Sequence, residues 1–472
     1  MIHLKTAVQL RELIAAREIS AREVLDAHLQ QIERVNEKVN AIVTMDAERA
    51  IQWSTQADEY QARGNELGVL HGLPVVHKDL FNTAGMRTTF GSPIYKNHIP
   101  DFDELVVQRL RAAGAISVGK SNTPEFGAGS QTFNEVFGST RNPYNLQKTC
   151  GGSSGGAAVA LATRMVPLAD GSDMGGSLRN PASFCNVVGF RPSTGRVPSW
   201  PSDHAWFSFG VQGPMARTVQ DASLMLAAIA GPDRRVPLSI VESGEQFLQP
   251  LDIDLRGKRV AFAPTLGGIP VSGEISEVIE AQRSVFVDLG CEVVDTCLEF
   301  GRADDVYKTL LAFRFAMKYC GLVEEHGNQM KETVLWNIAE GQKLSGADIA
   351  NAQRWRTDLF NRAIKFFERF DFLVGPVTQV APFNIEDPFV TEIEGTHFTS
   401  YIDWMQSCYL ITATGMPAIS VPAGFTENGL PVGIQIVGGY REDLEVLKMA
   451  NAFELATNIS AKAPKLSIRA NV

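Results

Sequence analysis

The sequence predicts an α/β fold in which a sheet, at least partly parallel, is covered by helices. Short apolar runs of strand length recur along the chain, and segments with helical apolar spacing fill much of the space between them. Such alternation is typical of strands joined by helical crossovers. The chain has 472 residues, of which 44% are hydrophobic, and this is enough for a large buried core. We therefore expect one α/β/α unit.

The apolar runs and the turn signals locate the elements. Ser20 and Glu23 have the spacing of a capping box, and apolar residues then recur at helical intervals, so a helix is predicted to begin there. Helices are also predicted at 104–113 and 274–289. Strands are predicted at residues 41–44, 75–77, 115–118, 165–169, 259–263, 292–294, 372–374, 418–421 and 433–437.

Composition and charge disfavour several classes of protein. The formal net charge is -10, which on average repels nucleic acid. No apolar run approaches the ~20 residues needed to span a bilayer, and the first residues lack the features of a secretory signal. The six cysteines form no C-x-x-C pair and are expected to be reduced thiols. The sequence therefore predicts a cytoplasmic protein with no membrane or nucleic-acid partner.

The most informative segment carries two Gly-Gly-Ser units, in Cys150-Gly-Gly-Ser-Ser-Gly-Gly156 and in Asp170-Gly-Ser-Asp-Met-Gly-Gly-Ser-Leu-Arg-Asn-Pro-Ala182. Glycine permits a positive φ and lets backbone amides approach a ligand closely. Successive amides before a helix form a concavity for an anion, such as a developing oxyanion. One Gly-Gly-Ser is usually an ordinary turn, but two that bracket a strand indicate a catalytic site.

Three chemistries compete for this segment. A phosphate loop is disfavoured because G-x-x-x-x-G-K-[ST] is absent, and no H-E-x-x-H indicates a metal site. A nucleophile elbow fits the letters of Gly152-Ser153-Ser154-Gly155-Gly156, but it needs a downstream histidine. His204, His326 and His397 are available, and none has a convincing context. A serine activated by a lysine is the third and preferred interpretation.

Lys78 is the candidate base for that chemistry. It ends the apolar run in Gly72-Leu-Pro-Val-Val-His-Lys-Asp-Leu80, so a strand would carry it toward the interior, although a surface lysine fits the sequence equally well. In a dry pocket the pKa of a lysine falls, and its neutral amine can accept the proton of a serine hydroxyl. The preceding His77 is expected to be a packed structural histidine.

These motifs resemble the amidase signature family. The matching segments are Gly151–Gly156, Asp173–Pro181, Gly189–Arg196, Lys78–Asp79, Gly119–Gly127, Gly138–Pro143, Gly213–Arg217, Gly415–Pro422 and Leu430–Gln435. The resemblance covers nearly the whole chain. It implies a mixed, largely parallel central sheet with helices on both faces, and no metal or organic cofactor.

The resemblance also implies roles for individual residues. Ser177 corresponds to the nucleophile and Lys78 to the general base, while Ser153 corresponds to a relay serine whose peptide bond is cis. Backbone amides from Met174 to Ser177, among them those of Gly175 and Gly176, correspond to the oxyanion hole.

Three further residues are expected to contact the substrate. Gly127 lies where the family has a backbone group in contact with the substrate. Arg179 could pair with a substrate carboxylate, although it is more often structural in the family. Trp206 lies in the aromatic loop 200–209, which directly follows the signature.

Residues 1–472 are expected to form one amidase domain. It would comprise an N-terminal helical part (1–70), a catalytic core (71–231 together with 371–472) and a more variable helical portion (232–370). The expected partner is a small-molecule amide, with a homodimer as the candidate assembly.

The expected substrate is a neutral apolar or aryl amide, anilide or carbamate. The aromatic loop, the apolar Met174 and the lack of an obvious second basic residue near Arg179 favour it. One alternative is the glutaminase (A) subunit of a tRNA-dependent amidotransferase, from which the segment before Gly213 departs. The other is a non-catalytic binding protein or scaffold, which the complete triad disfavours.

Overall fold

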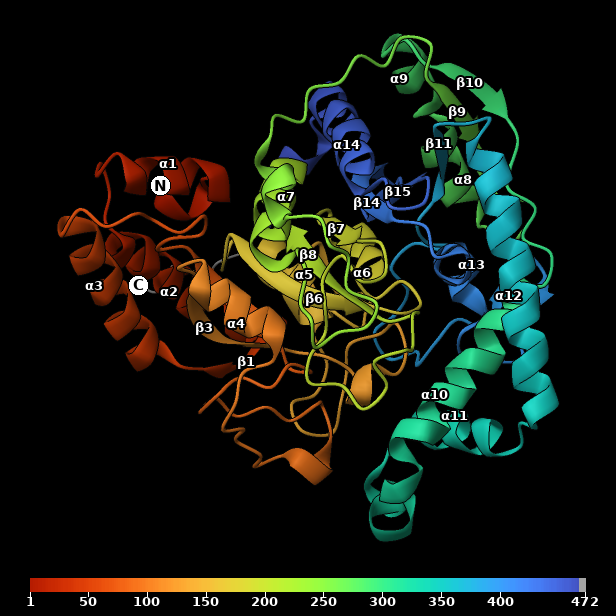
Figure 1. Ribbon diagram of the computed structural model, residues 1–472, viewed down its shortest axis with the longest axis horizontal. Helices are drawn as coiled ribbons and strands as arrows, with labels where there is room; N and C mark the ends of the chain where they lie inside the picture. Colours follow the sequence, from red (N-terminus) through yellow and green to blue (C-terminus); the bar gives the residue numbers. More distant parts are fainter. Residues whose placement is uncertain (467–472) are drawn as a thin grey trace.

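One long mixed sheet organises the chain, for which the computed structural model describes residues 1–466 (Figure 1). The sheet has 11 strands in the order β1-β3-β2-β6-β8-β7-β14-β15-β11-β9-β10. Its strands are β1 (Ile42–Met45), β2 (Pro74–Lys78), β3 (Ile116–Ser121), β6 (Leu168–Asp173), β7 (Val188–Arg191), β8 (Val211–Ala216), β9 (Arg259–Phe262), β10 (Glu292–Asp295), β11 (Phe372–Pro376), β14 (Ala418–Phe425) and β15 (Pro431–Gly438). Two small hairpins lie outside it, β4 (Arg141–Asn142) with β5 (Asn145–Thr149), and β12 (Glu392–Ile393) with β13 (Thr396–His397).

Helices pack on both faces of this sheet. The helices are α1 (Ala7–Ala15), α2 (Ala21–Val39), α3 (Ala47–Ala62), α4 (Leu105–Ala112), α5 (Gly155–Ala162), α6 (Arg179–Cys185), α7 (Val219–Ile229), α8 (Gly273–Glu280), α9 (Arg283–Asp288), α10 (Ala303–His326), α11 (Glu332–Gln342), α12 (Gly346–Phe367), α13 (Gln406–Thr414) and α14 (Asp443–Thr457). Helices α1–α3 lie at one end of the molecule and α10–α12 at the other (Figure 1).

Neighbouring residues of one strand belong to separate hydrophobic cores. Val75 packs in the core that contains residues of α1, α4, α7 and α14, whereas Val76 packs in the core that contains residues of α2, α5, α10 and α13. Successive strand side chains point to opposite faces, so a sheet covered on both faces must bury both. The predicted fold class, a mixed sheet with helices on both faces, is thus confirmed.

The sheet is partly parallel, as the sequence predicted, but parallel pairing occupies less of it than the resemblance implied. Parallel neighbours form two groups, β3-β2-β6 and β11-β9-β10. The strands between them pair antiparallel, from β6 through β8, β7, β14 and β15 to β11. The reason is that β7 and β8, which we did not predict, enter the middle of the sheet, and β14 and β15 form a hairpin beside them.

Most predicted elements are present with shifted ends. The capping box of Ser20 and Glu23 starts α2 as expected. The helix predicted at 274–289 is divided into α8 and α9. The strand predicted at 165–169 instead runs from Leu168 to Asp173, because its polar end, residues 170–173, pairs with β8. Within residues 1–466, no helix combines the length and apolar character needed to cross a bilayer.

Candidate active site

Lys78 is the last residue of β2 and is fully buried. Its backbone amide donates to Asp170 Oδ1 on the neighbouring strand β6 at 2.7 Å. His77 Nδ1 lies 2.5 Å from Asp170 Oδ2, and His77 Nε2 lies 2.7 Å from Ser117 Oγ. His77 is therefore a packed structural residue, as expected, and it helps to hold the end of β2 that carries the lysine.

The amine of Lys78 is surrounded by serine hydroxyls. Nζ donates to Ser153 Oγ at 2.7 Å, to Ser154 Oγ at 2.9 Å and to Ser172 Oγ at 3.1 Å. The sequence predicted only the contact with Ser153. Ser154 is its neighbour in the first Gly-Gly-Ser unit, and Ser172 lies on β6 two residues after Asp170, so the two-residue period of the strand could have identified it.

Burial weakens the affinity of this lysine for a proton. Desolvation lowers the pKa of Lys78 to about 7, against the opposing influence of the Asp173 and Asp170 carboxylates. A charged amine loses its hydration when it is buried, and here only hydroxyls replace that hydration directly. At neutral pH a substantial fraction of Lys78 is therefore a neutral amine that can accept a proton.

The peptide bond between Gly152 and Ser153 is cis, as the resemblance implied. Side chains of the preceding segment hold this turn. Ser130 Oγ donates to the Gly152 carbonyl oxygen at 2.7 Å, and Thr132 Oγ1 donates to the Gly151 carbonyl oxygen at 2.8 Å. These contacts fix the backbone from which the Ser153 hydroxyl reaches Lys78.

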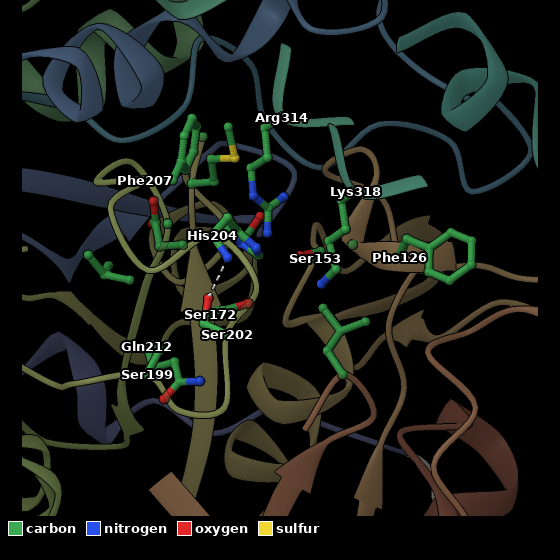
Figure 2. A pocket seen from close by; sticks show the side chains of 18 of the residues that line it. Phe126, Ser153, Ser172, Ser199, Ser202, His204, Phe207, Gln212, Arg314 and Lys318 are labelled. Atoms are coloured by element: carbon green, nitrogen blue, oxygen red, sulfur yellow. Dashed lines mark hydrogen bonds between the residues drawn. The ribbon is translucent and has the colours of Figure 1, made fainter. Parts of the chain in front are cut away.

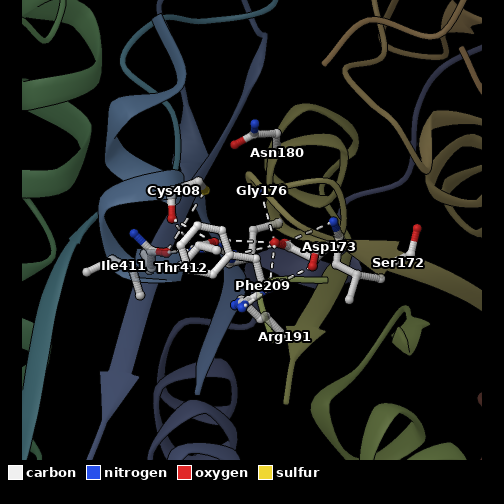
Figure 3. Close-up of polar contacts among 12 residues, drawn as sticks. Ser172, Asp173, Gly176, Asn180, Arg191, Phe209, Cys408, Ile411 and Thr412 are labelled. Carbon is white, nitrogen blue, oxygen red and sulfur yellow. Dashed lines mark hydrogen bonds and ion pairs between the residues drawn. The ribbon is translucent and has the colours of Figure 1, made fainter. Parts of the chain in front are cut away.

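Ser177 lies in the loop between β6 and α6, and Asp173 determines the shape of that loop (Figure 3). The Asp173 carboxylate accepts hydrogen bonds from the amides of Gly176 at 3.0 Å and Leu178 at 3.1 Å. These two amides flank Ser177 in the chain. The half-buried Ser177 faces the same cavity as Ser153.

Two buried arginines neutralise Asp173. Arg179 donates to both carboxylate oxygens, from Nε at 3.0 Å and from Nη2 at 2.9 Å, and Arg191 Nη1 lies 3.2 Å from Oδ1. Burial alone would raise the pKa of Asp173, but the two guanidinium groups outweigh it and hold the pKa well below its usual range.

The prediction that Arg179 contacts the substrate is wrong. Arg179 is 0% exposed and does not line the cavity. Its remaining donors are used by the Cys408 carbonyl, Gln435 Oε1 and Thr412 Oγ1, at 2.6–3.0 Å. The guanidinium therefore joins the Ser177 loop to α13 and β15, and no N–H is left to point at a ligand.

The predicted oxyanion-hole residues differ in whether they line the cavity. Met174, Gly175 and Ser177 line the cavity. The amide of Gly176 instead donates to Asp173 Oδ1, so the prediction that it belongs to the oxyanion hole is wrong. Within residues 1–466, the amides of Met174, Gly175 and Ser177 form no hydrogen bond with a protein acceptor.

The cavity has a volume of about 660 Å³, and Ser153 and Ser172 are among the residues that line it (Figure 2). Aromatic side chains form much of its wall: Phe81, Phe90, Phe126, Phe207, Phe315, Tyr307, Tyr319 and Tyr401. Trp206, by contrast, is 77% exposed and is not among the lining residues, so the prediction that it contacts the substrate is wrong. Its neighbour Phe207, in the same aromatic loop, lines the cavity instead.

Gly127 lines the cavity close to Ser153. A Cβ at this position would lie 3.4 Å from Ser153 Oγ. Its amide donates to the Pro124 carbonyl, which leaves the Gly127 carbonyl oxygen as the backbone group that can contact a ligand. Among the histidines weighed for a nucleophile elbow, only His204 reaches the cavity, and its Nδ1 pairs with Asp203 and not with a serine.

Sequence reasoning missed two basic residues that line the cavity. Arg314 and Lys318, both on α10, point into the cavity (Figure 2). Only their spacing of four residues on a predicted helix could have associated them with each other. Nothing in the local sequence associates them with the serines.

Comparisons with known proteins identify the family of this chain. The amidase family model matches residues 23–447. An acylamidase of Rhodococcus erythropolis is 34% identical over 470 residues, which covers 99% of this chain and 98% of the relative. The A subunit of the glutamyl-tRNA(Gln) amidotransferase of Bacillus velezensis is also 34% identical, over 97% of this chain and 98% of the relative.

A solved structure described as a bacterial aryl acylamidase of the amidase signature family superposes with a TM-score of 0.92 at 30% identity. The superposition covers 98% of this chain and 100% of that one. A 6-aminohexanoate cyclic dimer hydrolase superposes with a TM-score of 0.88 at 27% identity, over 98% of this chain and 99% of that one. The chain therefore belongs to the amidase signature family, and it is a hydrolase that acts on amide C–N bonds.

Proposed function

We propose that the enzyme cleaves its amide through an acyl-enzyme, with Ser177 as nucleophile, Ser153 as proton relay and Lys78 as general base. One observation carries the proposal: a fully buried amine lies 2.7 Å from the Ser153 hydroxyl. A pKa lowered to about 7 suits a base that works near neutral pH, because such a group can both accept and return a proton.

The hydrogen bonds around Lys78 support Ser153 as the proton donor to the neutral amine. A neutral amine has two N–H groups and one lone pair. The Ser154 hydroxyl donates to the Ser172 carbonyl oxygen at 3.4 Å, so Ser154 Oγ can accept from Nζ. The second N–H donates to Ser172 Oγ. The remaining lone pair then faces the Ser153 hydroxyl.

The proposed reaction has two stages, acylation of Ser177 and hydrolysis of the acyl-enzyme. Lys78 takes the Ser153 proton while Ser153 takes that of Ser177, and Ser177 Oγ forms a bond to the amide carbonyl carbon. The C–N bond breaks when the proton returns through Ser153 to the leaving nitrogen, which releases the amine. Water then adds to the acyl-enzyme by the same route, and the acid departs from Ser177.

The backbone amides of Met174, Gly175 and Ser177 are the proposed donors to the oxyanion. They border the cavity, and the Asp173 contacts hold their loop in place before substrate binds. Donors fixed in advance need no reorganisation when the negative charge develops, and this is the main source of their catalytic benefit. The Gly127 carbonyl is the proposed backbone acceptor for the substrate.

The proposed substrates are amides, anilides or carbamates with an apolar or aryl group. The aromatic wall of the cavity supports this class, since a ring buried against it would gain about 25 cal/mol per Å² of apolar surface removed from water. The expectation of a neutral substrate is not retained. It rested in part on the lack of an obvious second basic residue near Arg179, whereas Arg314 and Lys318 line the cavity.

A glutaminase is the second candidate function, because the A subunits of glutamyl-tRNA(Gln) amidotransferases match this chain with 32–35% identity. The structural likeness favours the stand-alone amidase. The corresponding protein of Thermotoga maritima superposes with a TM-score of 0.77, against 0.92 for the aryl acylamidase.

The test is an assay of the purified protein with anilides and with glutamine, combined with mass spectrometry. We expect anilide hydrolysis, an acyl or fluorophosphonate adduct on the peptide with Ser177 and none on Ser154, and loss of turnover in Ser177→Ala. A kcat/KM for glutamine ten times that for every anilide would favour the glutaminase. An adduct on Ser154 would overturn the assignment of the nucleophile.

A further inference from the structure

The α10 side of the cavity carries two cations that form no ion pair with an acidic residue among residues 1–466. Arg314 and Lys318 both line the cavity and are four residues apart, so they lie on one face of the helix (Figure 2). Within the described chain, neither forms an ion pair or donates a hydrogen bond. Both instead lie near aromatic rings. Arg314 Cζ is 5.9 Å from the centroid of the Phe207 ring, and Lys318 Nζ is 5.3 Å from the centroid of the Tyr319 ring.

Arg314 is also incompletely satisfied. Its Nε is buried and lacks a hydrogen-bond partner within residues 1–466. A buried donor without an acceptor is costly, and two like charges one helical turn apart repel each other. An anion between the two side chains would remove both penalties.

The acidic residues of the cavity are already engaged elsewhere. Glu104 accepts from the Asn82 amide at 3.1 Å, and Asp203 is paired with His204. Asp173 is held by Arg179 and Arg191. Asp173 is neutralised by its two arginines, whereas Glu104 and Asp203 interact with the charge of Lys318 at longer range. None of the three carboxylates forms an ion pair with Arg314 or Lys318, so both cations can still bind a ligand.

From this geometry we propose that the physiological substrate is an aryl or apolar amide that bears a carboxylate, and that Arg314 and Lys318 bind this carboxylate. A guanidinium offers paired N–H groups that match the two oxygens of a carboxylate, and the ammonium adds a second charge-assisted contact. The aromatic wall would hold the apolar part while the serines act on the amide. This inference rests on the proposed function and defines its substrate class.

The test uses matched substrates in which an isopropyl group replaces a carboxylate of similar shape. On the amine side the pair is 4-acetamidobenzoate and 4-isopropylacetanilide. On the acyl side it is succinanilate and 4-methylpentananilide. For at least one pair we expect kcat/KM of the carboxylate to exceed that of the isopropyl compound at least tenfold, and the ratio to fall as salt screens the charges.

Variants locate the effect. Arg314→Gln, Lys318→Gln and the double variant should each lower the carboxylate-to-isopropyl ratio, the double variant by at least tenfold. Lys318 is exposed, so its variant should fold even if that of Arg314 does not. Arg354→Gln on α12 is the matched control, since Arg354 is exposed and does not line the cavity, and it should leave the ratio unchanged.

The outcomes separate this inference from the proposed function. Hydrolysis of the isopropyl compounds without a preference for either carboxylate, or a preference that survives the double variant, would overturn the inference alone. Failure to cleave all four anilides, together with no fluorophosphonate adduct on Ser177, would overturn both.

Discussion

At the scale of single residues, burial suits Lys78 to its proposed role as general base. A lysine with its ordinary pKa would be almost fully protonated at neutral pH and could not accept a proton. The end of β2 places Lys78 where water is excluded, and Asp170 holds the adjacent backbone. The cost of burying the charge thus becomes the property that a general base needs.

The pH dependence tests this assignment. Because the folded pKa is lowered to about 7, the active neutral form is populated as pH rises through 7. We expect log(kcat/KM) for an uncharged anilide to rise with pH below about 7 and to level off above it. A rise that continues to pH 10 would contradict a buried base.

Replacements of Lys78 give an independent test at the same residue. Lys78→Ala should reduce kcat by several orders of magnitude. Lys78→Arg should not restore it, because a guanidinium stays protonated throughout the accessible pH range. Circular dichroism of both variants would check that they are folded.

Gly175 is required by a close approach to a stacked ring. A Cβ there would lie 2.2 Å from the hydroxyl oxygen of Tyr307. That ring cannot easily move, since it is stacked on Tyr409 with centroids 4.4 Å apart and on Phe209 at 6.0 Å. Any larger residue at 175 must therefore displace the loop that carries Ser177.

We therefore expect Gly175→Ala to lower kcat/KM at least tenfold. Tyr307→Phe removes the clashing oxygen, so the double variant Gly175→Ala/Tyr307→Phe should recover part of the loss relative to Tyr307→Phe alone. A double variant as impaired as the product of the two single changes would show that the clash is not the cause.

At the scale of elements, an ion-pair network ties the loop between β6 and α6 to the rest of the sheet. Asp173 ends β6, Arg179 begins α6, and Arg191 ends β7. Arg179 extends the network to Gln435 on β15. The position of Ser177 thus depends on strands that are distant in sequence.

Loss of Arg179 should destabilise the folded protein, because the buried charge of Asp173 would lose one of its two partners. We expect Arg179→Met to lower the free energy of unfolding by about 3–5 kcal/mol. Urea denaturation of the full chain measures it. The control Arg63→Met removes an exposed pair with Glu59 and should cost under about 1 kcal/mol. An Arg179→Met variant that raises KM without loss of stability would restore Arg179 as a substrate ligand.

At the scale of the whole molecule, the order of the strands differs from their order in the chain. The last two strands, β14 and β15, lie in the interior of the sheet between β7 and β11. The proposed core, made of residues 71–231 and 371–472, is therefore assembled only when the end of the chain is present.

Truncation tests whether the chain behaves as one domain. A chain that ends at residue 417 lacks two interior strands, so the apolar faces and edges of β7 and β11 would be exposed. We expect no cooperative thermal transition for it by circular dichroism, whereas the full chain should lose structure and activity in a single transition. A cooperative transition in the truncated chain would contradict the single-domain prediction.

The sequence by itself determined most of the elements and the composition of the candidate catalytic centre. Periodicity located nine strands of the sheet, because burial on both faces demands apolar runs. It missed β7 and β8, since Val188–Arg191 and Val211–Ala216 are short and interrupted by glycine, proline or polar residues. The two Gly-Gly-Ser units and the apolar run before Lys78 indicated a serine activated by a lysine, and the resemblance to the amidase signature family identified Ser153 and Ser177 as the candidate serines.

Only the tertiary structure decided what surrounds these residues. In the folded chain Arg179 is buried against Asp173, and Trp206 is exposed to solvent. Arg314 and Lys318, both on α10, line the cavity. A local pattern records which face of an element is buried, but not which distant element packs against it. The charge of the substrate pocket depends on that packing, and so it could not be predicted from the motifs alone.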